Sequence, residues 1–312
     1  MEIGFFNTDD NSNPTHTGKE LVVNPANQKI IENPTRKTAV EKALQFNELQ
    51  AAYDAALNGD TIRLISDTTE DITLPGYLQG VTLILENCRI QGDITTPIVN
   101  GLDRGNIIGV GNASISGAVT VFGASQFNRI EGLKLEGDAF RASQFENCYF
   151  TGYGLNISTG NGTNPAFANC IFTNNNTLFR QYGFGGGSFK NCEINCQNFS
   201  TRIGGLSSVG GTFRFENTKI FCGGNGLAWR GAVNLHFINS VYSANGSDYF
   251  IYGDANGIAN TYVESSKLIT ARTEIYSTPS NYTHINTQRN KPIGIGTEVY
   301  TNNDQERVNI EI

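Results

Sequence analysis

The sequence predicts an all-β protein whose chain coils into a parallel β-solenoid, and two observations predict it. The first is a short pattern that occurs six times: an aromatic or apolar residue, any residue, Asn or Ser, a small residue, any residue, an apolar residue. The second is the spacing of the pattern, whose central positions at 147, 169, 191, 217, 239 and 265 lie 22 or 26 residues apart, with Gly-rich spacers and no helical periodicity. A repeat of this length is typical of one solenoid turn.

Fainter copies centred on 87, 112 and 132 extend the series to nine rungs. Aligning the nine copies predicts three columns of inward side chains. The column two residues before the centre is apolar: Leu85, Val110, Ile130, Phe145, Phe167, Phe189, Phe215, Phe237 and Val263. The column three residues after it is apolar too: Ile90, Ile115, Leu135, Phe150, Phe172, Ile194, Ile220, Tyr242 and Leu268. The column between them, one residue after the centre, is mostly small: Cys88, Ala113, Leu133, Cys148, Cys170, Cys192, Thr218, Ser240 and Ser266.

The central residue is expected to form a corner. Strand side chains alternate between faces, so positions two before and one after the centre both point inward only if the chain bends between them. Asn, which tolerates the left-handed conformation of such a corner, occupies the centre in seven of nine copies. Stacked in register, these residues predict an asparagine ladder. Small residues five positions after the centre predict a second corner: Gly92, Gly117, Gly137, Gly152, Asn174, Cys196, Cys222 and Ala244.

With its Asn ladder and stacked aromatic residues, this pattern resembles the right-handed parallel β-helix of the pectate-lyase-like superfamily. The segment from Asn47 to Leu64 resembles that superfamily's opening, a short helix followed by a Gly-Asp turn and a first strand. Apolar spacing over Thr38 to Leu57 fits an amphipathic helix that caps the lower end of the stack. The expected organisation is an extended arm at 1–37, a capping helix and first strand at 38–64, the β-helix at 65–272, and a C-terminal cap or oligomerisation segment at 273–312.

Composition narrows the function classes. A net charge of -7 disfavours a general binder of nucleic acid. No signal peptide is expected at the start, and no window is apolar enough for a membrane span. Four of the six cysteines fall in the small inward column, which favours buried thiols over disulfides. The three histidines are scattered, so neither a metal nor a cofactor is expected.

Carboxylates give weak candidates for catalysis. Superfamily members that cleave polysaccharides use clustered carboxylates, with or without calcium. Here the best acidic group is Asp248 and Asp254, with Glu264 near the next rung. The outward glutamates beside the corner asparagines are interpreted as solvated surface charge.

A basic and aromatic flank is the stronger candidate for binding. Arg180, Arg202 and Arg230 recur just before a corner glycine, and Tyr252 continues the series. These arginines either bind anions such as acidic sugars or cover apolar surface and point to water. Aromatic residues nearby suit sugar stacking, and the flank comprises Arg180, Tyr182, Arg202, Trp229, Arg230, Tyr249 and Tyr252.

Three functions stay open. The first, which the resemblance to bacteriophage tail spikes and tail fibres favours, is a non-catalytic virion protein that assembles as a trimer and contacts host glycans or other virion proteins. The second is a polysaccharide lyase or glycoside hydrolase. The third is a bacterial surface adhesin or filament subunit, exported without a classical signal peptide. A cleft with converging carboxylates would favour the enzyme, and a symmetric oligomer would favour the virion protein.

Overall fold

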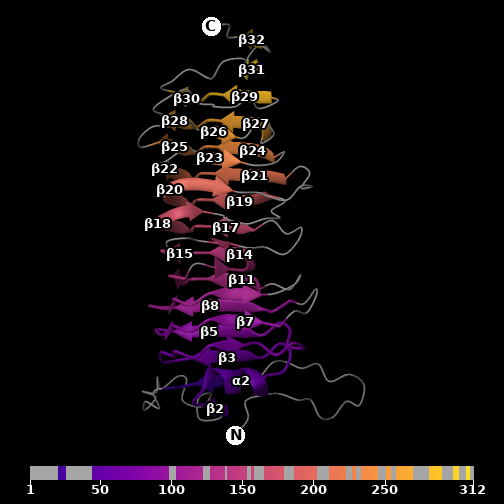
Figure 1. Cartoon of the computed structure of the whole chain (residues 1–312), viewed down its shortest axis with the longest axis vertical. Coiled ribbons are helices and arrows are strands. Elements are labelled where there is room, and N and C mark those ends of the chain that lie inside the picture. The colour runs from indigo at the N-terminus through magenta and orange to yellow at the C-terminus, as the bar shows by residue number, and fades with distance from the viewer. Residues whose placement is uncertain are drawn as a thin grey trace, which may run out of the picture. The chain divides into compact units, whose positions relative to one another are not determined.

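The computed structural model describes residues 20–25, 44–97, 103–121, 127–137, 139–152, 156–157, 165–178, 186–201, 211–222, 227–229, 233–244, 251–253, 258–269, 281–289, 298–301 and 307–309. The chain divides into two compact units, Met1–Ala142 and Ser143–Ile312. In each unit, parallel strands stack one above another (Figure 1). The prediction of an all-β parallel β-helix is confirmed.

The described residues of unit 1 form three sheets of parallel strands and one short helix, α2 (Leu49–Ala55). Its first sheet runs in the order β2 (Leu44–Phe46), β1 (Glu20–Val23), β3 (Thr61–Leu64), β5 (Thr82–Glu86), β8 (Asn106–Val110) and β11 (Phe127–Glu131). The second contains β6 (Arg89–Ile90), β9 (Ser114–Ile115) and β12 (Lys134–Leu135). The third contains β4 (Ile72–Thr73), β7 (Ile94–Thr96), β10 (Val119–Val121) and β13 (Ala139–Phe140).

Unit 2 contains two long sheets. The first runs through β14 (Ala142–Glu146), β17 (Ala166–Ala168), β19 (Gly186–Lys190), β21 (Gly211–Glu216), β24 (Val233–Ile238), β27 (Ile258–Glu264), β29 (Asn281–Ile285), β31 (Glu298–Thr301) and the antiparallel β32 (Arg307–Asn309). The second runs through β15 (Tyr149–Phe150), β18 (Ile171–Leu178), β20 (Glu193–Thr201), β22 (Lys219–Cys222), β25 (Val241–Ala244), β28 (Lys267–Ile269) and β30 (Gln288–Arg289). The remaining strands are β16 (Asn156–Ile157), β23 (Leu227–Trp229) and β26 (Ile251–Gly253), of which β23 pairs with β20 and β26.

The predicted corners are confirmed by backbone geometry. Seven of the nine central residues are non-glycine residues with φ between 47° and 54°: Asn87, Asn147, Asn169, Asn191, Asn217, Asn239 and Ser265. This left-handed conformation turns the chain from the first sheet into the second, because it breaks the alternation of the strand. Asn286, with φ of 49°, forms a further corner that the pattern missed. His284 and Arg289 occupy its two apolar positions, so the sequence signal is lost there.

The rung predicted around residue 112 is wrong by one residue. Gly111, with φ of 70°, is the corner, and Asn112 is an insertion after it. Val110 therefore pairs with Glu86 and is 45% exposed, whereas the inward position opposite Leu85 is Gly109.

Gly109 compensates for a large residue on the following rung. A Cβ atom at Gly109 would lie 2.5 Å from the carbonyl oxygen of Gly132 and 2.7 Å from Cδ2 of Leu133, which is buried in the otherwise small column. The missing side chain at one position thus makes room for the large one at the other.

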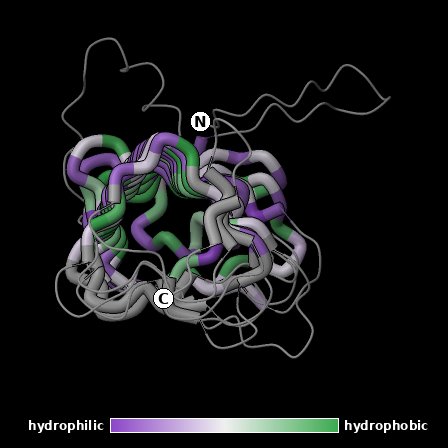
Figure 2. The backbone as a smooth tube through the Cα atoms, turned by 90° about the horizontal axis from the view of Figure 1, so that it is seen from above, coloured by the Kyte–Doolittle hydropathy of each residue, from purple (hydrophilic) through white to green (hydrophobic). Residues whose placement is uncertain are grey.

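Aromatic rings fill the core of unit 2. Phe145, Phe167, Phe189 and Phe215 stack face to face, with successive ring centroids 5.0, 4.7 and 4.8 Å apart. Phe150 and Phe172 form a second stack at 4.5 Å. Within each unit, the described turns follow one another around the interior (Figure 2). In unit 2 both apolar columns therefore point inward as predicted.

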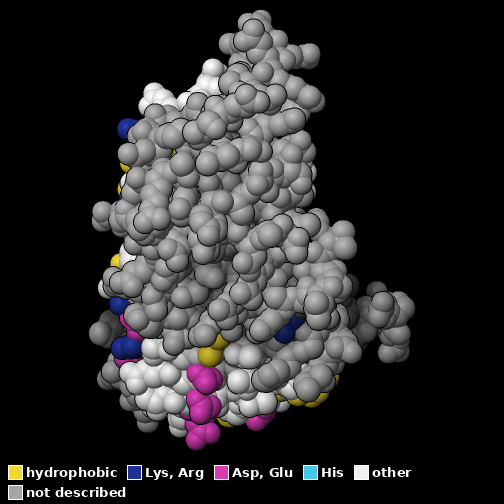
Figure 3. Space-filling view, turned by 45° about the horizontal axis from the view of Figure 1, so that its top comes forward, with side chains coloured by type: hydrophobic (Ala, Val, Ile, Leu, Met, Phe, Trp, Pro, Cys, Tyr) yellow, Lys and Arg dark blue, Asp and Glu magenta, His cyan; other side chains and the backbone are white. Residues whose placement is uncertain are grey.

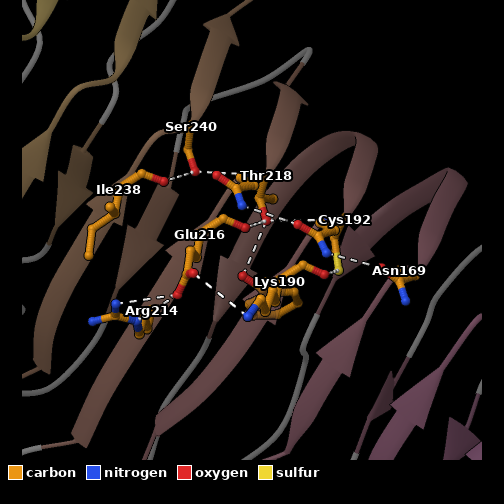
Figure 4. A network of polar contacts seen from close by, with 11 residues as sticks. Asn169, Lys190, Cys192, Arg214, Glu216, Thr218, Ile238 and Ser240 are labelled. Carbon is orange, nitrogen blue, oxygen red and sulfur yellow. Dashed lines mark hydrogen bonds and ion pairs between the residues drawn. The ribbon is translucent and has the colours of Figure 1, made fainter.

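The small column forms a buried ladder of polar side chains beside these rings (Figure 4). The Thr218 hydroxyl shares its one proton between the carbonyl oxygens of Glu216 (3.0 Å) and Phe189 (3.2 Å) and accepts from the backbone N–H of Cys192. Ser240 in turn accepts from the N–H of Thr218 at 3.0 Å. The ladder supplies hydrogen-bond partners for backbone groups that the corner removes from the sheets.

On the lower rungs the same positions hold thiols. Cys88, Cys148, Cys170 and Cys192 are buried and form no disulfide. Burial raises the pKa of the Cys88 thiol to about 12, and hydrogen bonding with Cys148 and Cys192, together with burial, raises the pKa of Cys170. We expect these four thiols to react slowly with a disulfide reagent in the native protein, because all four are buried and the reagent cannot reach them. Denaturation should expose six reactive thiols, and a count of two or fewer would contradict the prediction.

The residues at the predicted second corner differ between the two units. A Cβ atom at Gly92, Gly117 or Gly137 would lie 1.9 to 2.3 Å from a carbonyl oxygen of the previous rung, so only glycine fits there. In unit 2 this position holds Asn174, Cys196 and Cys222, and β18 and β20 continue through it for eight and nine residues. The glycines explain why the second sheet of unit 1 has two-residue strands and a third sheet follows.

The N-terminal segment differs from the expectation in two ways. Glu20–Val23, predicted within an extended arm, pairs in parallel with β3, and Leu21 and Val23 are fully buried. Residues 44–46, predicted to be helical, form β2 and pair with β1. Their alternation of apolar and polar residues fits a strand, and the neighbouring sheet edge provides hydrogen-bond partners.

Helix α2 is short and lies beside β1, β2 and β3 of the first sheet and β4 of the third sheet of unit 1. Glu70 accepts from the backbone N–H groups of Leu49 (3.0 Å) and Gln50 (3.1 Å), replacing the side-chain cap that Glu48 does not provide. The Gln50 amide bonds both the N–H and the carbonyl of Thr73, on the outer edge of β4. The helix therefore covers a strand edge that would otherwise be open to pairing.

Candidate binding face

Most of the residues proposed from sequence lie outside the described residues: Arg180, Tyr182, Arg202, Arg230, Asp248, Tyr249 and Asp254. Trp229 and Tyr252 are described in backbone only, on β23 and β26. The register pairs Trp229 with Gly253 and Tyr252 with Ala228, so Tyr252 lies one position away from Trp229. The arginine and aromatic flank stays a prediction.

Glu264 is the one proposed residue whose side chain is described, and it lies on the outer face of the first sheet of unit 2. Alternation along β21, β24 and β27 buries Phe213, Phe215, Leu235, Phe237, Thr261 and Val263. It turns the intervening residues outward: Thr212, Arg214, Glu216, Asn234, His236, Ile238, Asn260, Tyr262 and Glu264. We call these nine residues, with Lys190 of β19, the polar face.

Charged residues form one end of the polar face. Arg214 donates from Nε and Nη2 to Oε2 of Glu216 at 3.3 Å, and Nζ of Lys190 lies 3.9 Å from Oε1 of the same carboxylate (Figure 4). All three side chains are partly or largely exposed, so these ion pairs orient the groups more than they stabilise the fold.

Aromatic groups form the other end. His236 and Tyr262 occupy the same register position on adjacent strands, with ring centroids 5.8 Å apart and planes tilted by 53°. The Tyr262 hydroxyl donates to Oε2 of Glu264 at 3.0 Å. Beside them, Nδ2 of Asn260 donates to Oδ1 of Asn234 at 2.7 Å. The face thus presents aromatic rings, amides and the Glu264 carboxylate, which is held by its hydrogen bond to Tyr262, on neighbouring rungs.

Protonation on this face follows from its surroundings. Burial, and then the positive charge of Arg214, lowers the pKa of His236 below its ordinary value of 6.5, so the imidazole is neutral at pH 7. Burial, and then the bond to Glu264, raises the pKa of Tyr262, which keeps the phenol protonated. At neutral pH the two rings therefore act as uncharged hydrogen-bonding and stacking groups.

One buried hydroxyl beneath the face has no partner among the described atoms. Thr261 Oγ1 is enclosed between the core and the strands, while its neighbours Asn260 and Tyr262 point outward. We expect Thr261→Val to raise the free energy of unfolding by about 1 kcal/mol, because it removes an unsatisfied polar group without changing the side-chain shape. The matched change Thr218→Val, which removes a hydroxyl with three partners, should lower it by about 1 to 3 kcal/mol. Urea denaturation of both variants checks the pair, and a loss at Thr261 would contradict it.

Three aspartates of unit 1 accept hydrogen bonds from backbone N–H groups of the following rung. Asp71 accepts from the N–H of Asp93, Asp93 from that of Ala118, and Asp67 from that of Arg89. Acidic side chains lie in a row on the visible surface (Figure 3). Stacked carboxylates of this kind hold successive turns together as the asparagines do.

The asparagine ladder is confirmed in part and lies outside the core. Nδ2 of Asn191 donates to Oδ1 of Asn169 at 3.1 Å, and Asn217 continues to Asn191 at 3.2 Å. These side chains are exposed. The left-handed corner turns the central side chain outward, so the ladder runs along the surface.

Sequence analysis missed the polar face apart from Glu264. Its members vary from rung to rung, and alternation with the buried columns was the signal that could have found them.

Within the described ranges, no group of three or more His, Cys, Asp or Glu side chains could hold a metal ion. No helix in the described part of the chain is long and apolar enough to cross a membrane.

Comparisons of the chain with family models, with curated proteins and with solved structures found no match. The parallel β-helix seen in both units is consistent with the pectate-lyase-like superfamily, an architecture that supports many functions.

Proposed function

We propose that this chain is a non-catalytic glycan-binding β-helix of a virus particle, of the tail-spike or tail-fibre type, and that the polar face contacts the glycan. The observation that carries the proposal is the register of this face. Thr212, Asn234 and Asn260 fall in one column, and Arg214, His236 and Tyr262 in the next. A polysaccharide also repeats along its length, so groups repeated at rung spacing can meet successive sugars.

The chemistry of the face suits carbohydrate. Amides and a carboxylate bond hydroxyl groups, and an aromatic ring packs against the apolar side of a sugar. The contacts between Tyr262 and Glu264 and between Asn260 and Asn234 fix these groups before a ligand arrives. Preorganised groups lose less conformational entropy on binding.

Hydrolysis is the second candidate, because two carboxylates share one column. Glu216 and Glu264 both pair with Ile238, so their strands lie two spacings, about 10 Å, apart. That approaches the separation of about 6.5 to 9.5 Å in inverting glycosidases. However, Glu216 accepts from Arg214 and Glu264 accepts from Tyr262, so both act as acceptors and neither is placed as a proton donor. This favours binding over cleavage.

A polysaccharide panel separates the two functions. The purified chain is titrated with neutral and acidic polysaccharides by calorimetry, and the same mixtures are assayed for new reducing ends and for ultraviolet-absorbing unsaturated sugars. Binding without products supports the proposal. Cleavage that Glu216→Gln or Glu264→Gln abolishes would establish the hydrolase instead, and an absence of binding across the panel would overturn the glycan proposal.

The pH dependence of binding should report the kind of glycan. As pH falls through the lowered pKa of His236, the imidazole gains a proton and the face gains positive charge beside Arg214. Affinity for an acidic glycan should then rise severalfold, and affinity for a neutral one should not. His236→Gln should remove the pH-dependent part, and an unchanged profile in that variant would contradict this role. Because the folded-state pKa of His236 is lowered, its contribution to stability is present above 6.5 and is lost as pH falls below that value.

A further inference from the structure

The second sheet of unit 2 carries an exposed column whose chemistry differs from that of the polar face. The register stacks one outward residue per rung along β15, β18, β20, β22, β25 and β28: Tyr149, Ile171, Glu193, Lys219, Val241 and Lys267. We call these six residues the pairing face. Tyr149 is 40% and Ile171 43% exposed, and Phe221, next to the column on β22, is 40% exposed. Exposed apolar side chains interspersed with charges are typical of an interaction surface.

The column is complementary to a second copy of itself whose rungs run in the opposite order. Read from one end it is aromatic, aliphatic, acidic, basic, aliphatic and basic. Turned end for end against itself, it places Tyr149 opposite Lys267, Ile171 opposite Val241, and Glu193 opposite Lys219. These are a cation–π pair, an apolar pair and an ion pair, and symmetry makes each contact twice.

We infer that a second copy of this chain docks on the pairing face, around a twofold axis that runs along the strands between Glu193 and Lys219. Rotation about this axis reverses the order of the rungs and keeps the column facing itself. The alternative twofold axis, along the stacking direction, would oppose each residue to its own copy. It would place Glu193 against Glu193 and Lys219 against Lys219, and such like-charge contacts are unfavourable.

Side-chain contacts within the chain support this geometry. Nδ2 of Asn195 donates to Oε1 of Glu193 at 3.1 Å, and the Thr173 hydroxyl donates to Oη of Tyr149 at 3.1 Å. Both bonds hold a member of the pairing face in place. Phe221 lies two residues after Lys219 on β22, and its rung is one of the two that flank the proposed axis. The two Phe221 rings would therefore lie on adjacent rungs of the dimer.

Pairing would leave the polar face open on each copy. A one-residue corner separates the first sheet from the second, and the two sheets therefore face different directions. If the proposed glycan function holds, the dimer binds its polymer at two sites and gains avidity without new contacts. The arginine and aromatic flank predicted from the sequence, which includes Arg180 and Trp229, is a different set of residues.

Mass measurement with charge reversal tests the pairing independently of any glycan. Sedimentation of the wild type should give twice the mass of the chain. Glu193→Lys should weaken association about tenfold or more, because it places two lysines in contact, and adding Lys219→Glu should restore it. Circular dichroism should show unchanged folding, since both side chains point outward. A monomer at high concentration, a trimer, or a double variant that stays as weak as the single one would overturn the inference.

Cross-linking fixes the direction of the pairing. Ile171→Cys protein mixed with Val241→Cys protein should form a disulfide dimer that joins the two variants, and neither variant alone should do so efficiently. The native thiols Cys88, Cys148, Cys170 and Cys192 are buried and should stay silent, and the wild type serves as the control. Self-linking of Ile171→Cys as efficient as the mixed reaction would contradict the antiparallel arrangement.

Discussion

Replacing Phe167 by alanine is expected to lower the free energy of unfolding by about 3 to 5 kcal/mol. Its ring is 1% exposed, stacks between Phe145 and Phe189, and meets Phe172 edge-on at 5.5 Å. Stacked rings on the rungs above and below cannot close the gap without leaving their own strands, so the cavity remains.

Chemical denaturation measures this loss. Tyr77→Ala is the control, because that aromatic side chain is 64% exposed and its removal should cost less than about 1 kcal/mol. Equal losses in the two variants would show that the stack does not form the core.

Gly117→Ala is expected to cost about 3 kcal/mol, although it adds a single methyl group. A Cβ atom at Gly117 would lie 2.0 Å from the carbonyl oxygen of Gly92, which belongs to the backbone of the previous rung. Gly92 lies between β6 and β7, so relieving this contact requires a shift of the backbone turn that joins these two strands.

Gly187→Ala is the matched control for this change. Its nearest contact would be 3.4 Å, to the carbonyl oxygen of Pro165, and alanine restricts the unfolded chain more than glycine does. Thermal melts should therefore separate the two variants, with Gly187→Ala close to the wild type. A stable Gly117→Ala protein would remove the steric account of the second corner.

The sequence was sufficient to predict the columns because each column repeats one physical requirement on every rung. The left-handed corner selects Asn at 147, 169, 191, 217 and 239, and the core beside it selects phenylalanine. Prediction failed where a small residue in an apolar column compensates for a large residue in the small column, as Gly109 does for Leu133. It also failed where a polar residue occupies an apolar position, as His284 does. Such compensation acts between rungs and is not visible within one repeat.

The candidate site was less predictable for the same reason. Sequence analysis looked for recurring residues and chose the arginines of the spacers. The polar face instead carries different residues on each rung, Arg214, His236 and Tyr262, whose common feature is their register. A face that binds a ligand needs varied groups at fixed positions, and repetition alone cannot find it.

The account rests on a division of roles, in which inward columns hold the fold and the polar face binds the glycan. Calorimetric titration of the His236→Ala, Tyr262→Ala double variant with the bound polysaccharide tests this most directly, with Lys134→Ala, an exposed change in unit 1, as the control. We expect affinity about tenfold or more weaker in the double variant and an unchanged melting temperature in both. Unaltered affinity in a folded double variant would contradict the account.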